Sequence, residues 1–564
     1  MSARASIAHA SIAHASIAHA SIAHASSAHA SSAHASSAHA SIAHAAVLLA
    51  LCLSAGAAQA QSSRATGTSP LRACCSDVIA ATFAPTDTAV SLWRVAGNAS
   101  DAATAVPDAR AWRRTRVELS YVDGTSHRPQ DAATTTRAAL IAEGGQLIRA
   151  WSALGRVGYE RHADAGVRWR HHAEVYDGMQ YSWADSIGGD FRRDVLTLAT
   201  TAASPAWRGW RGGVGVDYAL GQGARQNDPR PLSRRRLVEL APALSFTHQH
   251  HQFGAVVRRE WVREDLEIGG GSSTEYPVLF RLRGIATFDR TQLITGERAM
   301  LGRAAGGTLG YAFRGDAWQI AASGNARRLV IDARDGIATP VTGGTSRVLR
   351  YGGRLLLRHE RRAGVRRGAL PTAAHGRDGG IELDARIVHE TSRGTDPIFA
   401  AVNAIDRGWS APLSVTWWRG EDPCAGRWRV SAGVQPMGLE RRDVAAQARW
   451  SVRSWRPTAT IGHRVRGQSP WLVALSGSTT RIIESSLDVP QITRITDVIA
   501  VDDARLLQTA RWTTSLELMY EVQQRDATWA RARVGVGMLR HPALLLTDRT
   551  ARGRAQFTFA WELL

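Results

Sequence analysis

The segment from Arg554 to Leu563 is RAQFTFAWEL, and its strict alternation recurs along the chain. Successive side chains of a β-strand point to opposite faces, so a period of two predicts a strand. One face would carry Ala555, Phe557, Phe559, Trp561 and Leu563, and the other Arg554, Gln556, Thr558, Ala560 and Glu562. Outer-membrane barrels commonly end in an aromatic-rich strand of this kind. We therefore predict a closing strand marked by Phe557, Phe559, Trp561 and Leu563, although Leu564 falls out of phase.

The same alternation occurs in the two preceding segments and at several places upstream. Apolar residues alternate with polar ones over 511–522, 531–538, 428–435, 354–362, 278–288 and 213–220. The polar face carries both arginine and acidic residues. On a soluble sandwich this face would meet solvent, and in a barrel it would line the lumen. Periodicity does not separate the two.

Three features favour a membrane barrel: the predicted export signal described below, the aromatic-rich closing strand and the tryptophans. No apolar run of 18 or more residues follows the N-terminal leader, so the pattern excludes a transmembrane helix. The 19 tryptophans could form interfacial girdles, many of them at predicted strand ends: Trp151, Trp207, Trp210, Trp417, Trp418, Trp455, Trp471, Trp529 and Trp561. The predicted fold is an all-β, transmembrane, antiparallel β-barrel over 111–564, with about 16 strands and a range of about 14 to 18.

The N-terminus indicates export. Residues 6–45 are eight tandem pentapeptides of the type SIAHA or SSAHA, for which a metal-binding tail is the weaker interpretation. The apolar run 46–58 has the length of a signal-peptide core and precedes Ala58-Gln59-Ala60, so Gln61 is the expected mature N-terminus. We expect 1–60 to be a repeat tract plus a cleaved signal peptide, or a later start codon. Residues 61–110 lack alternation and are predicted to be a periplasmic or lumen-inserted segment.

The charge balance is strongly basic but dispersed. All 69 basic residues are arginine, which base composition explains more simply than chemistry. Because arginines are spread along the chain among the acids, the pattern argues against a nucleic-acid partner and favours a charged lumen lining. Cys74, Cys75 and Cys424 remain after cleavage. They allow one possible disulfide, from Cys74 or Cys75 to Cys424, and no zinc site.

Short motifs resemble a known family. They are Trp93 with Gly97-Asn98, Glu143-Gly144 before Gly158-Tyr159, and Tyr218 followed by Arg225 and Asp228-Pro229-Arg230-Pro231. With these the chain resembles an uncharacterised outer-membrane β-barrel family, a domain of unknown function found mainly in Bacteroidota-type bacteria. The resemblance implies a barrel and an outer-membrane location, and no activity. The N-terminal repeat and the lack of lysine depart from the family pattern.

Two groups of polar residues are candidate sites. Arg225, Asp228 and Arg230 could bind an anionic ligand at a loop, because the arginine fork suits carboxylate and phosphate. The simpler alternative is a turn with internal pairing. His248, His250 and His251, and the pair His171-His172, have spacings that could hold a metal. Neighbouring strand residues diverge, however, so we expect solvent-facing turns and no metal.

No catalytic motif is present. The chain lacks Gly-x-Ser-x-Gly, His-Glu-x-x-His and a phosphate-binding loop with lysine, so no cofactor is expected. The preferred function is a non-enzymatic pore, transport or receptor barrel with an arginine- and acid-lined lumen. The alternatives are a barrel hydrolase of lipase or protease type, and a soluble secreted propeller or sandwich. Expected partners are outer-membrane lipid, the barrel-assembly machinery and small anionic solutes. Extracellular loops are expected at 221–233, 269–276, 334–346, 364–380 and 482–506.

Overall fold

A computed structural model describes most of the chain from residue 112 onward. The described ranges are 112–125, 127–172, 181–227, 230–269, 278–292, 295–336, 338–362, 377–420, 428–465, 471–523, 529–540 and 553–563. All of them lie in one compact unit, Pro70–Leu564. The predicted signal cleavage at Ala58 to Gln61, the segment 61–110 and the three cysteines lie outside these residues.

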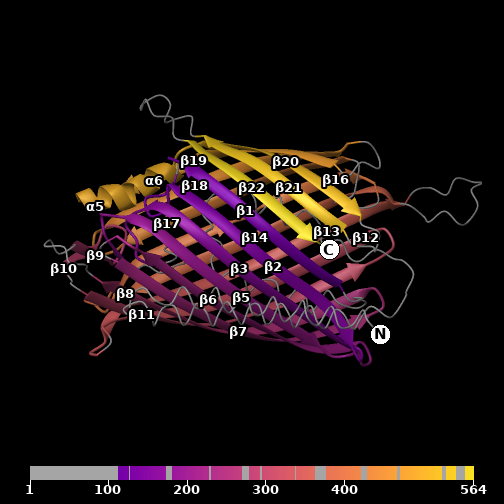
Figure 1. Cartoon of the computed structure of the whole chain (residues 1–564), viewed down its shortest axis with the longest axis horizontal. Coiled ribbons are helices and arrows are strands. Elements are labelled where there is room, and N and C mark those ends of the chain that lie inside the picture. The colour runs from indigo at the N-terminus through magenta and orange to yellow at the C-terminus, as the bar shows by residue number, and fades with distance from the viewer. Residues whose placement is uncertain are drawn as a thin grey trace, which may run out of the picture. The chain divides into compact units, whose positions relative to one another are not determined.

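Long antiparallel strands form one closed sheet. In chain order they are β1 Trp112–Gly124, β2 Thr134–Ile148, β3 Trp151–Val167, β5 Gly189–Ala203, β6 Trp210–Arg225, β7 Arg230–His248, β8 His251–Gly269, β11 Thr295–Arg314, β12 Trp318–Asp335, β13 Val341–Arg362, β14 Arg377–Thr395, β15 Val402–Ser410, β16 Leu413–Arg419, β17 Trp428–Asp443, β18 Ala448–Arg464, β19 Trp471–Asp488, β20 Arg511–Gln523, β21 Trp529–Arg540 and β22 Gly553–Leu563. Each strand pairs with its neighbours in chain order (Figure 1).

The sheet closes because its last strand pairs with its first. β22 pairs with β21 on one side and with β1 on the other, from Thr115 opposite Leu563 to Gly124 opposite Arg554. β15 and β16 are two segments of a single wall strand, since both pair with β14 and β17. The break contains Pro412, which has no backbone N–H to donate to a ladder. The 19 segments thus form a barrel of 18 strands, which confirms the predicted antiparallel barrel with slightly more strands than the expected 16.

The two faces of the wall differ as the alternation predicts. On β7, Val238, Leu240 and Leu244 are exposed on the outer face, while Leu237 and Glu239 are buried on the inner face. The same division recurs around the barrel, and the outer face carries most of the large exposed apolar side chains. An apolar exterior and a polar, charged interior are what a barrel in a bilayer requires.

The two ends of the barrel have different connections. We call the end at which β1 begins and β22 ends the terminal end, and the other the cap end. Connections at the terminal end include the short links 149–150, 204–209, 249–250 and 315–317. Connections at the cap end carry β4 Ser182–Ala184, β9 Val278–Leu282, β10 Phe288–Gln292, and the helical segments α5 Arg494–Thr496, η3 Asp497–Val501 and α6 Asp502–Leu507.

Several predicted loops have different bounds. The expected loop 221–233 is mostly strand, because only 226–229 lie between β6 and β7. For the expected loop 334–346, only 336–340 lie between β12 and β13. The segment 364–380 joins β13 to β14 at the terminal end, opposite the other four predicted loops, so the five cannot all be extracellular. The alternating stretch 278–288 is not part of the wall. It forms β9 and β10, each of five residues, too short to cross a bilayer.

Among the described residues, no helix combines the length and the apolar character needed to cross a membrane.

Exposed tryptophans gather at the terminal end. Trp151, Trp210 and Trp471 begin β3, β6 and β19 there, Trp207 lies in the β5–β6 connection, and Trp417 lies near the end of β16. Trp418 is an exception to the prediction, since it points into the barrel and is 1% exposed. Its ring lies under the Arg358 guanidinium at 4.9 Å. The side chains of Trp529 and Trp561 lie outside the described set.

Adjacent Trp417 and Trp418 allow a matched test of which face is buried. Trp418→Ala is expected to lower the free energy of unfolding by about 3 to 5 kcal/mol, because it leaves a cavity inside the wall. Trp417→Ala, on the exposed outer face, should change it far less in detergent. Urea unfolding of the refolded barrel, followed by tryptophan fluorescence, measures both. Equal losses would contradict the assigned faces.

Candidate functional site

Three connections meet over the mouth at the cap end and form a structure that we call the cap. Its apolar centre combines residues from the β3–β5, β8–β11 and β19–β20 connections, which leave the wall at widely separated strands. The cluster consists of Trp169, Ala184, Phe280 and Leu282, with Val278, Phe288, Ile495, Val498 and Ile499 packed against it. β9 pairs with both β4 and β10, so two of the connections share a small sheet. Figure 1 shows β9, β10, α5 and α6 at the same end.

The β9–β10 hairpin reaches across the mouth. It starts from β8 and returns to β11, yet Ile285 packs against Trp450 and Val452 of β18. Five strands of the wall lie between β11 and β18 by the shorter route. Helical residues Ala500 and Ala504 complete the same apolar cluster. A hairpin that spans so much of the circumference must cross the opening.

Buried polar contacts fix the hairpin to the far wall. The Arg283 guanidinium pairs with Asp396 at 2.7 Å and with Asp289 at 2.9 Å. Asp443 of β17 accepts hydrogen bonds from the Thr287 backbone N–H at 2.8 Å and from Thr287 Oγ1 at 2.7 Å. Asn403 Nδ2 donates to the carbonyl of Arg283 at 2.9 Å. A buried charge without such partners would be costly, so these contacts hold the tip in one place.

Asp185 holds the β3–β5 connection against the wall. The side chains of Asp185, His171 and Arg225 are all fully buried. Arg225 donates to Asp185 at 2.7 Å, and His171 Nε2 donates to the same carboxylate. The backbone N–H of Gly188 donates to its other oxygen at 2.9 Å. Burial would raise the pKa of Asp185, but His171 and Arg225 lower it to about 2. Burial also lowers the pKa of His171, which favours the neutral imidazole.

The neighbouring histidine makes a second contact with the wall. His172 Nδ1 lies 3.5 Å from Glu264, and Ser233 Oγ donates to Glu264 at 2.7 Å. The prediction that His171 and His172 face solvent is therefore wrong. Their segment folds inward with the cap.

The contacts of Ser233, Glu264 and His172 do not match those of a serine hydrolase. Here the carboxylate lies between the serine and the histidine, whereas in a hydrolase the histidine must contact the serine to take its proton.

The other predicted site residues do not converge. Arg225 is buried against Asp185, whereas Arg230 is exposed at the start of β7, and Asp228 lies outside the described residues. His250 Nδ1 lies 3.0 Å from the carbonyl of Arg314, and His251 Nδ1 lies 2.9 Å from the Tyr311 hydroxyl. Within the described ranges, no group of three or more His, Cys, Asp or Glu residues is arranged to hold a metal. The ligand role of Arg225, Asp228 and Arg230 stays a prediction.

One half of the inner wall is charged. Asp217, Glu239 and Glu260 lie directly opposite one another on β6, β7 and β8. Arg327 of β12 donates two hydrogen bonds to Glu260, both at 2.6 Å, and Arg258 Nε lies 3.9 Å from Glu239. These arginines offset the repulsion expected between carboxylates in adjacent cross-strand positions.

A second charged group lies on β1 to β3. Arg137 bridges Glu118 at 2.7 Å and Glu160 at 2.9 Å. On the opposite side, the inner faces of β16 to β20 add hydroxyls to charged residues such as Arg429, Arg456 and Glu517. Thr416 and Ser431 lie 2.9 Å apart, and Ser476 hydrogen-bonds Ser515. The lumen therefore presents arginines and acids on both sides, with hydroxyl groups added on β16 to β20.

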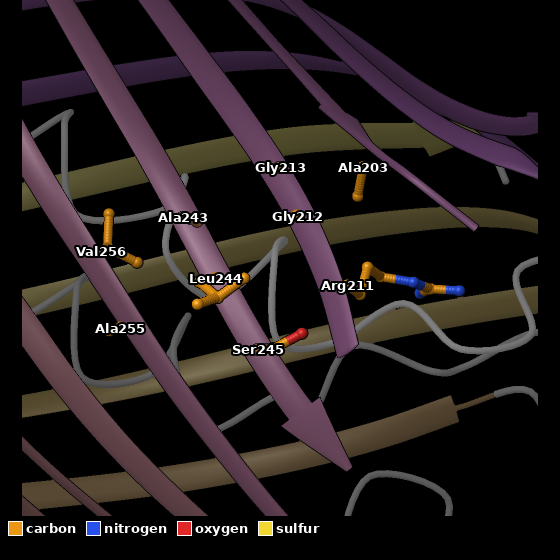
Figure 2. Close-up of a pocket in the computed structure, with 9 residues that line it drawn as sticks. All are labelled: Ala203, Arg211, Gly212, Gly213, Ala243, Leu244, Ser245, Ala255 and Val256. Carbon is orange, nitrogen blue, oxygen red and sulfur yellow. The ribbon is translucent and has the colours of Figure 1, made fainter. Parts of the chain in front are cut away.

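Solvent reaches the interior of the barrel. Ser323 and Asn325 of β12, Arg386 of β14 and Thr458 of β18 are on the inner faces of their strands and are nevertheless exposed. A shallow recess also lies in the wall toward the terminal end of β5 to β8 (Figure 2). Small residues leave this space, among them Ala203, Gly213 and Ala243, with Arg211 at its edge. The recess has few polar groups, so it is not an evident binding site for a charged ligand.

Sequence reasoning missed the cap because its alternation resembles that of wall strands. The signal that distinguishes it is length, since β9 and β10 have five residues each, whereas a crossing needs about 9 to 11. The anchoring partners Asp396, Asn403 and Asp443 are more than 100 positions away from the hairpin. No local pattern marks them.

The neutral His171 predicts that acid weakens the cap. Its pKa is lowered in the folded cap, so the unfolded segment binds more protons as the pH falls below about 6.5. Stability from this group is complete above that pH and is lost below it. The protection factors of the amides in 168–172 and 181–188, which correct for the fall of the intrinsic exchange rate with pH, should decrease between pH 7.5 and pH 5.5. His171→Gln should reduce this pH dependence, and an unchanged dependence would assign it to another group.

Comparisons with known proteins give a family and distant structural matches. The model of a family described as of unknown function (DUF6850) matches residues 107–563. No curated protein matches the chain. Solved structures similar to it include OccAB3 of Acinetobacter baumannii, with 10% identity, TM-score 0.33, 80% of this chain and 98% of that chain covered. OccK9 (OpdG) of Pseudomonas aeruginosa has 12% identity, TM-score 0.34 and coverages of 81% and 99%. The copper transporter OprC has 9% identity and a TM-score of 0.35, with 81% of this chain and 82% of that chain covered. Similarity this distant carries no argument about activity.

Proposed function

Since the chain belongs to the family of unknown function DUF6850, we propose its function from the barrel itself: a non-enzymatic outer-membrane barrel that passes polar solutes through a capped lumen. The single observation that carries this proposal is the β9–β10 hairpin, which crosses the mouth of a polar interior that solvent reaches. A barrel that served only as a structural element would need neither a polar lumen nor a cap tied to it by buried ion pairs.

The orientation follows from the connections. Outer-membrane barrels have short turns on the periplasmic side and longer loops outside. The cap end, with its three elaborated connections, would therefore face the exterior, and the terminal end the periplasm. The signal peptide before Gln61, a periplasmic or lumenal role for 61–110, delivery by the barrel-assembly machinery and occurrence in Bacteroidota-type bacteria remain predictions that fit this placement.

The solute class follows from the lining. A lining of arginines, acids and hydroxyls suits small polar solutes that carry charge and hydrogen-bonding groups. Small anions are favoured if the constriction is dominated by arginine. The reversal potential in a salt gradient would test this preference, since a cation-selective value would contradict it.

The cap predicts a conductance that can be raised by mutation. Asp443→Ala removes the acceptor that holds Ala286 and Thr287, so the hairpin tip should detach and the conductance of the refolded protein in planar bilayers should rise. Asp332→Ala is the matched control, because Asp332 is exposed on the outer face of β12.

A stronger variant replaces 270–294 with a short Gly-Ser linker and removes the hairpin altogether. It should give the largest conductance of the set. If neither this variant nor the wild-type barrel conducts, although both insert into the bilayer, the transport proposal fails and a closed structural or receptor barrel is favoured.

A further inference from the structure

Several arginines on the outer face lie at a similar height around the barrel. On β3, β12 and β19 an exposed tryptophan at the terminal end is followed, ten positions later and on the same face, by an exposed arginine. The pairs are Trp151 with Arg161, Trp318 with Arg328, and Trp471 with Arg481. Other strands repeat the spacing with an aromatic partner: Phe253 with Arg263, Arg236 with Phe246, Arg303 with Phe313, and Arg407 with Trp417.

This spacing has the dimension of a membrane. Ten residues of a strand tilted by about 40° rise about 25 Å along the barrel axis, which matches the apolar band of an outer-membrane barrel. Exposed apolar side chains fill the interval, such as Tyr159 on β3 and Leu475 on β19. The tryptophans therefore mark one boundary of the band, and the arginines mark the other, on the side of the cap.

Four exposed arginines lie close together on the outer face, with one acid, Asp332 of β12, beside them. Arg303, Arg328, Arg347 and Arg393 lie on the consecutive strands β11 to β14, and all four are exposed. Arg347 and Arg393 are directly opposite each other, and Arg303 and Arg347 flank the same residue, Val330. We call these four the arginine patch. Among the described residues none of them has an ion pair with an acid.

Several arginines elsewhere at this height are paired. Arg234 contacts Glu267 at 2.7 Å, Arg263 contacts Asp265 at 2.8 Å and Arg453 contacts Glu484 at 2.9 Å. Directly opposite like charges such as Arg347 and Arg393 destabilise a sheet unless something compensates them. Among the described residues, the four arginines of the patch therefore lack the ion pairs that Arg234, Arg263 and Arg453 have.

If the barrel is placed in the membrane as proposed above, anionic lipid headgroups can supply the negative charge that faces the arginine patch. We propose that the arginine patch binds the headgroup of an outer-leaflet glycolipid that carries two phosphates. Arginine forms bidentate, charge-assisted hydrogen bonds with phosphate. Four strands at about 4.8 Å spacing extend over about 14 Å, which is wider than one phosphate and fits two phosphates at the ends of a disaccharide. The acyl chains of such a lipid would lie on the apolar band directly below.

Lipid binding by the full barrel tests this inference. Native mass spectrometry in a neutral detergent would measure binding of diphosphoryl lipid A, monophosphoryl lipid A and phosphatidylglycerol. The patch variant is R303Q/R328Q/R347Q/R393Q. The matched control is R234Q/R236Q/R263Q/R453Q, which removes four exposed outer-face arginines that have acidic partners. All eight side chains are exposed, and heat-modifiable migration on gels verifies that each variant has folded.

The expected result is that wild type binds the diphosphoryl lipid most tightly and that the patch variant binds it about tenfold more weakly or worse. The control should stay near wild type, and a fourfold Arg→Lys patch variant should recover part of the binding. Equal losses in patch and control variants would overturn the patch as a site. Equal affinity for phosphatidylglycerol would overturn the two-phosphate ligand. Failure of the wild-type barrel to insert into nanodiscs would instead overturn the membrane placement and, with it, this inference.

Discussion

The pairing of β22 with β1 is the constraint on which the remaining structure depends. A bilayer offers no water to backbone N–H and C=O groups, so a spanning sheet must have no free edge. Closure of 18 antiparallel strands satisfies this requirement and creates two environments that differ completely. Outside, alternate residues are apolar. Inside, the same strands supply arginines, acids and hydroxyls, because charge is tolerated only where water or a partner reaches it.

Closure of the sheet also leaves an opening at each end of the barrel. The cap crosses one of these openings and is held there by buried ion pairs. A hairpin that leaves the wall between β8 and β11 gains apolar contacts only by reaching other elements, here Trp450 on β18 and the helical segment before β20. Its polar backbone would be unsatisfied there without Asp443, Asp396 and Asn403. Asp185 performs the corresponding task for the β3–β5 connection. A cap held by a few directional contacts can be released without unfolding the wall.

The outer face adds a second organisation that is independent of the lumen. On several strands an aromatic residue at the terminal end and an arginine toward the cap end are separated by the length of a crossing. Such a difference between the two boundaries suits an asymmetric membrane, whose two leaflets have different headgroups. On β11 to β14, Arg303, Arg328, Arg347 and Arg393 have no ion pair with an acid among the described residues.

The sequence by itself determined the fold class, the direction of the apolar face and the closing strand, because strand alternation is local and has a period of two. Tertiary structure decided which alternating segments belong to the wall. Val278 to Phe288 alternates like a crossing strand but folds into the cap, and Trp418 faces the interior although Trp417 beside it faces outward. It also decided that Arg225 and His171 share Asp185 and that Arg347 and Arg393 face each other. These contacts join positions far apart in the chain, and they depend on the register of neighbouring strands and the path of connections, which no local pattern encodes.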